Sequence, residues 1–476
     1  MTDASIPSSG QDFVPFANKM RGADLDERLI ELFRSYYEQV RQGQTGMIPE
    51  SEIEPVTSRD VTRRKDLNHG ERAIGTKALE QAVIVKLNGG LGTSMGLARA
   101  KSLLNVRGNH NFLDITLLQA SGCRGRLDYS VPLVLMNSFS THEDTMQYLE
   151  DKGVKPSDRP LTFLQHMYPK ILRDTMQPAQ WPRDPELEWN PPGHGDLYAA
   201  LVTSGMLDKL LQSGKRYAFV SNVDNLGAVM DISILGHFVR SGSPFMMEVA
   251  VRTKSDTKGG HLARLPDGRL VLREIAQCPE EDLESFQDIS RHSYFNTNNI
   301  WLDLRRIKDF VDQHGLPRLP LILNPKHLDP RDENSPEVFQ VETAMGAAIA
   351  AFPGAEVLRV PRERFIPVKK CNDLLAVRSD CYVFTRECEF TVNPERTLDT
   401  VVIDLDTEYY KKIDALEARF PFGPPSLVAC ASLSVTGDVL FERDVACIGE
   451  VRVVNSTSGQ ATVPAETRIQ GDLRFD

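Results

Sequence analysis

"VIVKLNGGLGTSMGLARAKSLLNV", residues 83–106, joins an apolar run to a segment rich in glycine. Residues 82–87 are apolar at nearly every position, which predicts a buried β-strand. Four glycines follow within eight residues: Gly89, Gly90, Gly92 and Gly96. Glycine lets backbone N–H groups approach an anion closely, and Lys101 adds a positive charge five residues later. The stretch therefore predicts a strand that opens into a phosphate-binding loop.

Two familiar phosphate motifs do not match this loop. A P-loop ends in Gly-Lys-Ser/Thr, but Leu97 follows Gly96 here. A dinucleotide fingerprint that starts at Gly90 requires glycine at position 95, where Met95 stands. The residues alone leave two readings, an anion-binding loop of another kind or a tight connection between a strand and a helix. The number of glycines favours the first, since fewer would serve a simple connection.

Length and charge restrict the classes of function. The chain has 476 residues, which predicts two or three domains because single cores rarely exceed roughly 250–300 residues. Its formal net charge is −11 and its pI is near 5.5. Domains that bind nucleic acid are usually basic. We therefore expect no nucleic acid as the main partner.

The cysteines and the apolar runs indicate a cytoplasmic protein without a membrane segment. None of the seven cysteines has CxxC spacing, which argues against a zinc site or a disulfide framework. The first residues are polar and lack the basic-then-apolar pattern of a secretory signal. No apolar run approaches the roughly 20 residues that cross a bilayer.

Strand-like and helix-like segments alternate after the glycine segment. Residues 131–138 and 217–225 are apolar runs that end in small or polar residues, and 194–214 has a helical pattern. This alternation predicts a parallel α/β sheet, whose ligands gather at the carboxyl ends of the strands. Further strands are expected at 245–253, 269–277 and 297–304.

The two ends of the chain differ from its middle. We expect a flexible lead over 1–22 and an amphipathic helix over 24–42, with acidic residues in the first turn. Near the C-terminus a short unit recurs as GDVLF at 437, GEVRV at 449 and GDLRF at 471. This weak repeat predicts a small parallel β-solenoid. A few strands of an antiparallel sandwich are the alternative.

The glycine segment resembles the nucleotide-binding loop of the eukaryotic-type UTP–glucose-1-phosphate uridylyltransferases, or UDP-glucose pyrophosphorylases. The family signature, Leu-x-Gly-Gly-Leu-Gly-Thr-x-Met-Gly and then Lys-Ser/Thr, is matched through Gly96 and again at Lys101 and Ser102. Other similar stretches follow in the family's order: TFLQHMYPKI (162–171), NPPGHGDLY (190–198), FVSNVDNLGA (219–228), KGGHL (258–262), EIAQCP (274–279), FNTNNIW (295–301) and RFIPVKKCNDLL (364–375). One departure is GLARAKS, which replaces the glycine-proline step often found before the family's lysine.

The resemblance implies an architecture in three parts. Residues 1–80 correspond to an N-terminal helical segment. Residues 81–385 correspond to a GT-A-like nucleotide-diphospho-sugar transferase domain, an α/β domain with a Rossmann-like mixed sheet. Residues 386–476 correspond to a left-handed β-helix.

The resemblance also implies roles for individual residues. At the nucleotide it places Leu87, Gly89, Gly90, Met136, Gln165, Gly193 and Asp224. At the sugar it places Asn222, Gly259, Glu274, Asn296, Asn298 and Phe365. The catalytic residues are Lys101, Lys369 and His194, and the ligand of a Mg²⁺ cofactor is Asp224.

The residue types fit these roles, although each also has a structural explanation. The amide of Gln165 offers a donor and an acceptor, as the edge of uracil requires. Asp224 follows a predicted strand, and Mg²⁺ at phosphate sites is held by one or two carboxylates. Taken alone, however, Gln165 is an ordinary surface residue, Asp224 a helix cap, His194 a structural histidine, and Lys369 with Lys370 a solvated pair.

The implied reaction converts UTP and α-D-glucose 1-phosphate into UDP-glucose and pyrophosphate, reversibly. The second pKa of a phosphate monoester is about 6, so the attacking phosphate is mostly dianionic at neutral pH and needs no general base. The obstacle is repulsion between anions, which Lys101, Lys369, His194 and Mg²⁺ can offset. UTP is expected to bind first. The sequence leaves open whether the chain forms a homo-oligomer.

Two other functions compete with this one. The UDP-N-acetylhexosamine and broad UDP-sugar pyrophosphorylases share the fold, but their loop tends to carry Thr-Arg-Leu-Gly where this chain has Thr93-Ser94-Met95-Gly96. That difference favours glucose. The second alternative is a UDP-sugar sensor without catalysis, which the complete set of phosphate-handling residues disfavours.

Overall fold

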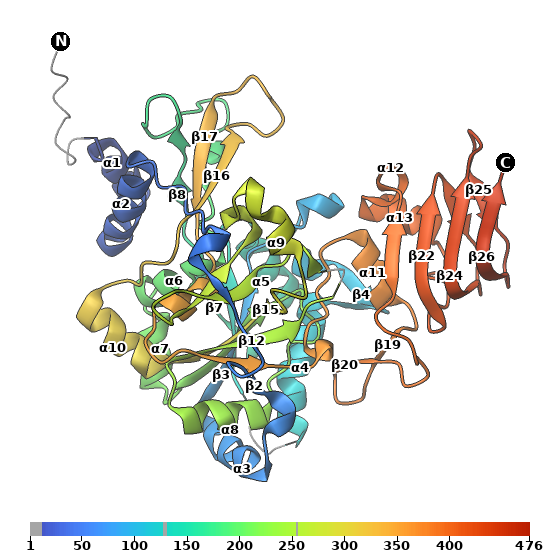
Figure 1. Cartoon of the computed structure of the whole chain (residues 1–476), viewed down its shortest axis with the longest axis horizontal. Coiled ribbons are helices and arrows are strands. Elements are labelled where there is room, and N and C mark those ends of the chain that lie inside the picture. The colour runs from blue at the N-terminus through green and yellow to red at the C-terminus, as the bar shows by residue number, and fades with distance from the viewer. Residues whose placement is uncertain (1–11, 127–130, 254–255) are drawn as a thin grey trace.

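The computed structural model describes residues 12–126, 131–253 and 256–476 (Figure 1). Within these residues, a mixed sheet of eleven strands forms the centre of the molecule. Eight of them lie side by side in the order β2 (Thr62–Arg63), β18 (Glu356–Arg359), β12 (Phe245–Val251), β15 (Tyr294–Asp303), β11 (Tyr217–Asn222), β3 (Ala82–Asn88), β6 (Leu133–Asn137) and β7 (Leu161–Leu164). The other three are β1 (Glu54–Pro55), β13 (His261–Arg264) and β14 (Leu270–Arg273), which join through β13.

The directions of the strands correct one prediction. β3 is parallel to both β11 and β6, and β6 is parallel to β7, as the alternating pattern predicted. β15, however, is antiparallel to both β11 and β12. The direction follows from the partners with which β15 pairs: β13, which lies in the connection between β12 and β15, is antiparallel to β15 as well. The strand expected over 269–277 is shorter, because β14 ends at Arg273.

Both faces of the central sheet are buried. On β3, Val83 and Val85 belong to the apolar core on one face, whereas Ile84 belongs to the core on the other. Helices cover the two faces: α3 (His69–Ala78), α4 (Phe112–Arg126), α5 (His142–Asp151), α6 (Leu197–Thr203), α7 (Met206–Gln212), α8 (Ile232–Ser241), α9 (Leu283–Gln287) and α10 (Leu304–His314). α6 and α7 replace the single helix expected over 194–214, because Gly205 between them has a φ of 72°.

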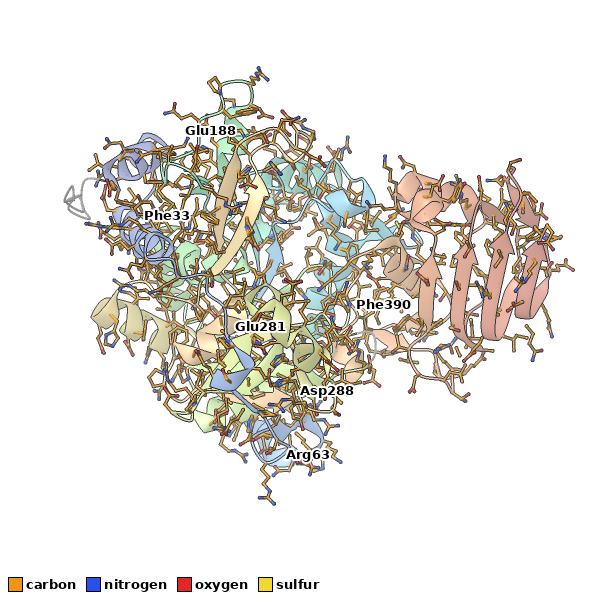
Figure 2. All side chains as sticks on the ribbon, turned by 45° about the horizontal axis from the view of Figure 1, so that its top comes forward. Phe33, Arg63, Glu188, Glu281, Asp288 and Phe390 are labelled. Atoms are coloured by element: carbon orange, nitrogen blue, oxygen red, sulfur yellow. The ribbon has the colours of Figure 1, made fainter. Side chains whose placement is uncertain are left out.

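The N-terminal helices α1 (Val14–Gly22) and α2 (Glu27–Arg41) pack on the central domain through aromatic rings. Phe33, labelled in Figure 2, lies 4.8 Å from Tyr168 between ring centroids. α2 confirms the predicted helix, and Asp26 caps it by accepting a hydrogen bond from the N–H of Arg28. The flexible lead was wrong over 14–22, where Phe16 is fully buried; residues 1–11 lie outside the described part.

Smaller sheets surround the centre. They consist of β4 (Asn105–Arg107) with β5 (His110–Asn111), β8 (Tyr168–Pro169) with β10 (Trp189–Asn190), β16 (Ile322–His327) with β17 (Glu337–Glu342) and β9 (Ile171–Leu172), and β19 (Tyr382–Phe384) with β20 (Phe390–Val392). None of the described helices is both long and apolar enough to cross a membrane.

The C-terminal part is built from parallel strands, which excludes the antiparallel sandwich. β21 (Val402–Leu405), β22 (Cys430–Thr436), β24 (Ala446–Asn455) and β26 (Arg468–Phe475) form one sheet, and β23 (Val439–Phe441) with β25 (Ala461–Val463) forms another. The three sequence repeats, however, do not occupy equivalent positions in these sheets. GDVLF falls on β23, and Gly471 of β26 pairs with Val451 of β24 rather than with Gly449.

The C-terminal strands share an apolar core with the segments around the glycine loop. This core includes Met95, Val368 and Leu433, and the helices α11 (Cys371–Arg378), α12 (Thr407–Tyr410) and α13 (Ile413–Arg419) contribute to it. Phe390 belongs to the same core and lies at the junction in Figure 2. The parallel strands therefore support the loop that follows β3.

Candidate active site

The glycine loop leaves the carboxyl end of β3 and turns back on itself. Gly92 and Gly96 adopt the left-handed conformation, with φ of 66° and 76°, on either side of a 3-10 turn at Thr93–Met95. The N–H of Lys101 donates to the carbonyl of Gly90, at 3.0 Å. Only glycine adopts such φ values without strain, so the glycines are what brings Lys101 back beside Gly90.

The predicted base-binding residues converge from four segments of the chain. Gln165 follows β7, and its Nε2 donates to the carbonyl of Gly193 at 2.9 Å. Its Oε1 faces Gly89 so closely that a Cβ there would lie 2.9 Å from it. Leu87 of β3 and Met136 of β6 are paired in register beside them. The structure therefore brings these five predicted nucleotide residues together.

Lys101 meets Asp224 at the carboxyl end of β11. The Lys101 Nζ lies 2.5 Å from Asp224 Oδ2, and the two side chains are 12% and 16% exposed. Asp224 caps no helix here, since the side chain that caps α8 is that of Asp231. Asp224 therefore does not act as the cap of α8. Instead, its carboxylate forms an ion pair with the ammonium of Lys101 beside the glycine loop. Asn222 ends β11 opposite Leu87 of β3.

His194 is held as a neutral hydrogen-bond donor. Burial, with a smaller contribution from the charge of Lys369, lowers its pKa to about 4. The N–H of Met345 donates to its Nδ1 at 2.9 Å. Because Nδ1 accepts and the ring is neutral at pH 7, Nε2 carries the hydrogen. His194 can therefore donate to a phosphate oxygen, but it is not a base, since Nε2 is already protonated.

Lys369 is exposed, and its main chain contacts the glycine loop. Its backbone N–H donates to Asp373 at 2.7 Å, and its carbonyl accepts from Ser94 Oγ of the glycine loop at 3.4 Å. Besides burial, the charge of Lys369 acts on the pKa of both His194 and Glu274 and lowers each, which places its ammonium within electrostatic range of a predicted phosphate residue and a predicted sugar residue.

The carboxyl of Glu274 lies against Gly260, the residue after the predicted sugar residue Gly259. Burial raises the pKa of this carboxyl, and the charge of Lys369 opposes that rise. A Cβ at Gly260 would lie 2.4 Å from Glu274 Oε2, so glycine is required there for the carboxylate to keep its place. Gly259 donates its N–H to the carbonyl of Asp256 in the same turn.

Asn296 and Asn298, both predicted sugar residues, lie at a bulge in β15. Val249 of β12 pairs with Asn296 and its neighbour Glu248 pairs with Asn299, which leaves Asn298 out of register with a φ of 56°. Asn296 Nδ2 donates to Asn298 Oδ1 at 2.8 Å. Bulges often re-aim side chains beside active sites, and a non-glycine residue with positive φ is uncommon.

Two groups for which the sequence predicted no specific role support the site. Asn225 ties the loop after β11 to the segment that carries Lys369: its Oδ1 accepts from the N–H of Ile366 at 2.9 Å, and its Nδ2 donates to the carbonyl of Arg364 at 3.2 Å. The polar run SNVDN contained this signal. The second group is the ion pair between Arg362 and Asp256, in which the two nitrogen–oxygen distances are 2.7 and 2.9 Å.

The Arg362 guanidinium also lies over the rings of Phe295 and Phe365, at 5.0 and 5.5 Å from their centroids. It thereby connects the turn before Gly259 to Phe365, a predicted sugar residue. No local sequence pattern reveals this pair, because its members are 106 residues apart.

Comparisons with known proteins identify the family to which this chain belongs. The sequence profile of the family described as UTP–glucose-1-phosphate uridylyltransferase matches residues 30–447. The chain is 41% identical to the UTP–glucose-1-phosphate uridylyltransferase of Solanum tuberosum over 390 residues, which cover 82% of this chain and 80% of that protein. It is 40% identical to the probable enzyme of Schizosaccharomyces pombe over 387 residues, covering 81% of this chain and 75% of that protein.

Solved structures are similar over almost the whole chain. A UDP-glucose phosphorylase from Trypanosoma brucei has a TM-score of 0.89 and 43% identity, covering 98% of this chain and 100% of that one. A mutant UDP-glucose pyrophosphorylase from Leishmania major, solved in complex with UDP-glucose, has a TM-score of 0.91 and 40% identity, with coverage of 98% and 100%. On the profile match and these identities, the chain belongs to the UTP–glucose-1-phosphate uridylyltransferase family.

Proposed function

We propose that this UTP–glucose-1-phosphate uridylyltransferase works by a single direct displacement. A phosphate oxygen of α-D-glucose 1-phosphate forms a bond to the α-phosphorus of UTP. The bond from that phosphorus to the bridging oxygen breaks, and its electron pair leaves with pyrophosphate. The observation that carries this proposal is the convergence of a neutral donor, His194, with the two lysines Lys101 and Lys369 at one edge of the sheet.

The nucleotide is bound by the groups beside β3. Gln165 pairs with the edge of uracil, while Leu87, Met136 and Gly193 line the base. The backbone of the glycine loop, including Gly89 and Gly90, cradles the phosphates. Support comes from the contacts of Gln165 with Gly193 and Gly89, which fix the amide between two glycines.

The sugar is bound on the other side of Lys369. Glu274, Asn296 and Asn298 supply acceptors and donors for its hydroxyls, with Asn222, Gly259 and Phe365 around them. The bulge in β15 and the requirement for glycine at 260 support a built site for a polar ligand.

Catalysis rests on positioning and charge, because the chemistry needs no proton transfer. The attacking phosphate is already mostly dianionic at neutral pH, since its second pKa is about 6. Two unit charges about 4 Å apart repel by roughly 4 kcal/mol at an effective dielectric of about 20. Lys369 and Lys101 offset this repulsion, and Nε2–H of His194 donates to the α-phosphate, where charge develops.

Mg²⁺ fits this site, with Asp224 as its protein ligand. Groups of three or more histidine, cysteine or acidic residues that can hold an ion are absent from the residues described. A single carboxylate is nevertheless what Mg²⁺ uses at phosphate sites, where substrate oxygens and waters complete its shell. When bound, the ion neutralises charge on the phosphates and on the leaving pyrophosphate.

The architecture and the location belong to the same proposal. We infer a helical segment over 1–80, a GT-A-like domain over 81–385 and a left-handed β-helix over 386–476. A cytoplasmic location is supported by the cysteines, because the six that are described are all free thiols.

Pyrophosphate release tests the function. The purified chain with UTP and Mg²⁺ is given glucose 1-phosphate, galactose 1-phosphate or N-acetylglucosamine 1-phosphate in parallel. We expect a strong preference for glucose 1-phosphate. Equal rates would indicate a broad UDP-sugar enzyme, and binding of UDP-glucose without any pyrophosphate release would indicate a sensor.

A further inference from the structure

A buried histidine–aspartate pair stands directly behind the base-binding residues. The Asp196 side chain is completely buried, and each of its carboxylate oxygens contacts His166. The backbone N–H of His166 donates to Oδ2 at 2.7 Å, and ring atom Nδ1 lies 2.8 Å from Oδ1. One carboxylate therefore fixes both the main chain and the side chain of the same residue.

The pair connects the two segments that carry the proposed nucleotide contacts. His166 is the residue after Gln165, and Asp196 ends the 3-10 turn that begins with His194. Both segments also meet at the carbonyl of Gly193, which accepts from Gln165 Nε2 at 2.9 Å and from the N–H of Asp196 at 3.3 Å. A movement of Asp196 would therefore change the position of Gly193 relative to Gln165.

The imidazole ring of His166 is fixed at its second nitrogen as well. Nε2 lies 2.8 Å from the hydroxyl of Thr203, on α6. The same hydroxyl lies 3.0 Å from the carbonyl of Ala199, one turn earlier in α6. The ring thus joins the turn 194–196 to the helix that covers the sheet.

These contacts determine the orientation of the side-chain amide of Gln165. Nε2 faces the carbonyl of Gly193 and Oε1 faces Gly89. Uracil offers a donor at N3 and an acceptor at O4, whereas cytosine offers an acceptor at N3 and a donor at N4. An amide that is free to rotate by 180° can satisfy either base, so only a fixed amide discriminates between them.

We propose that His166 and Asp196 are positioning residues that hold Gln165 in the orientation that prefers UTP to CTP. The inference rests on the proposed role of Gln165 at the base. Neither residue touches the substrate. Their effect is to keep Gly193 and the main chain after Gln165 at a fixed separation, which binding of uracil requires.

Asp196→Asn tests the pair with a minimal change of shape. An amide has only one acceptor oxygen, so its NH₂ group faces either the backbone N–H of His166, where that hydrogen bond is lost, or Nδ1, where the ring must change its tautomer. We expect the ratio of kcat/KM for UTP to that for CTP to fall by about 10-fold or more, as displacements near 1 Å commonly cost. The KM for glucose 1-phosphate should be unchanged.

Four further variants make the result decisive. Thr203→Val removes the contact at Nε2 together with the bond from the hydroxyl to the carbonyl of Ala199 in the same helix. It should lower the same ratio less, which keeps the test available if Asp196→Asn does not fold. His237→Gln is the control: His237 also lies near a carboxylate, 3.7 Å from Glu356, but on α8, and should leave the ratio unchanged. In the double variant Gln165→Ala with Asp196→Asn, the ratio should be no lower than in Gln165→Ala alone.

Two outcomes would overturn the inference, and they differ. If Gln165→Ala lowers the ratio but folded Asp196→Asn and Thr203→Val do not, the pair does not position the amide. If Gln165→Ala itself leaves the ratio unchanged, the proposed role of Gln165 is wrong, and the inference that rests on it fails too.

Discussion

The ammonium of Lys101 lies 2.5 Å from the carboxylate of Asp224, although the two residues come from different strand ends. Lys101 is brought there by the glycine loop after β3, and Asp224 by the end of β11, which is parallel to β3 and adjacent to it. The pair therefore depends on the parallel pairing of two strands and on the turn at Gly92 and Gly96. It places one positive and one negative group where a phosphate chain and its magnesium ion are expected.

Replacement of Lys369 by alanine should lower kcat by about 10²-fold or more, because a positive group aimed at developing charge is removed from the site. The side chain is exposed, so the fold should be unaffected. Lys370→Ala is the control, since that neighbouring lysine is also exposed. Steady-state kinetics with circular dichroism checks both variants. Near-normal turnover of Lys369→Ala would remove Lys369 from the mechanism.

The lowered pKa of His194 makes a prediction about stability. The folded protein holds this ring with a pKa of about 4, whereas an unfolded histidine has a pKa of about 6.5. Between these pH values the unfolded chain binds a proton that the folded chain does not. The free energy of unfolding should therefore decrease as the pH falls from about 6.5 to about 4.

His194→Gln removes this contribution, so its stability should depend less steeply on pH over the same window. Urea unfolding of both proteins at several pH values measures the difference. Parallel curves would mean that the ring is not held neutral. The His194→Gln enzyme should also keep the acid limb of kcat/KM, which arises from the sugar phosphate with its pKa near 6.

Gly260→Ala should weaken the binding of glucose 1-phosphate. The new Cβ would lie 2.4 Å from Glu274 Oε2 and would displace the carboxylate. We expect the KM for glucose 1-phosphate to rise by about 10-fold, the effect of losing roughly one hydrogen bond to a charged group, with the KM for UTP unchanged. Gly459→Ala is the control, because a Cβ there meets nothing within 4 Å. Equal increases in both KM values would contradict the assignment of Glu274 to the sugar.

Arg362→Gln should also act on the sugar site alone. It breaks the pair with Asp256 and removes the guanidinium from above Phe365. The KM for glucose 1-phosphate should rise several-fold, since a partly exposed charge pair contributes about 1 kcal/mol. Arg64→Gln is a matched control: Arg64 pairs with Asp231 in the same two-bond manner, at 2.7 and 3.2 Å. A similar change in both variants would show that the Arg362 pair has no special role.

Removal of Mg²⁺ with EDTA should stop pyrophosphate release without lowering the melting temperature. Within the described residues no cluster of three or more potential metal ligands exists for a structural ion. Excess Mg²⁺ should restore the rate. Pyrophosphate release that persists in EDTA would show that the reaction does not need Mg²⁺ and that Asp224 is not a metal ligand.

Local patterns predicted the parts of the fold and site that depend on neighbouring residues. The strand before the glycine loop and the helix capped by Asp26 were confirmed, and the predicted family was confirmed by the comparisons. The reversed direction of β15 was not predictable from its own apolar residues, because direction depends on the strands with which it pairs, and those lie far away in the sequence. The helix α1 was missed because its nine residues are short and mixed in polarity.

The remaining site features depend on contacts between distant residues. His166 and Asp196 are 30 residues apart, and Arg362 and Asp256 are 106 apart. Neither pair has a sequence pattern of its own. The buried position of Asp196 and the tautomer of His194 follow only from three-dimensional packing. The individual roles of the site residues remain predictions that the variants above test.

The stereochemistry at the α-phosphorus tests the central claim, a single direct displacement, most directly. UTP with one α-oxygen replaced by sulfur, in a single configuration, is converted with glucose 1-phosphate, and the configuration of the thio-substituted UDP-glucose is determined. One in-line displacement predicts inversion at phosphorus. Retention would require two displacements and a covalent uridylyl-enzyme, which would contradict the account.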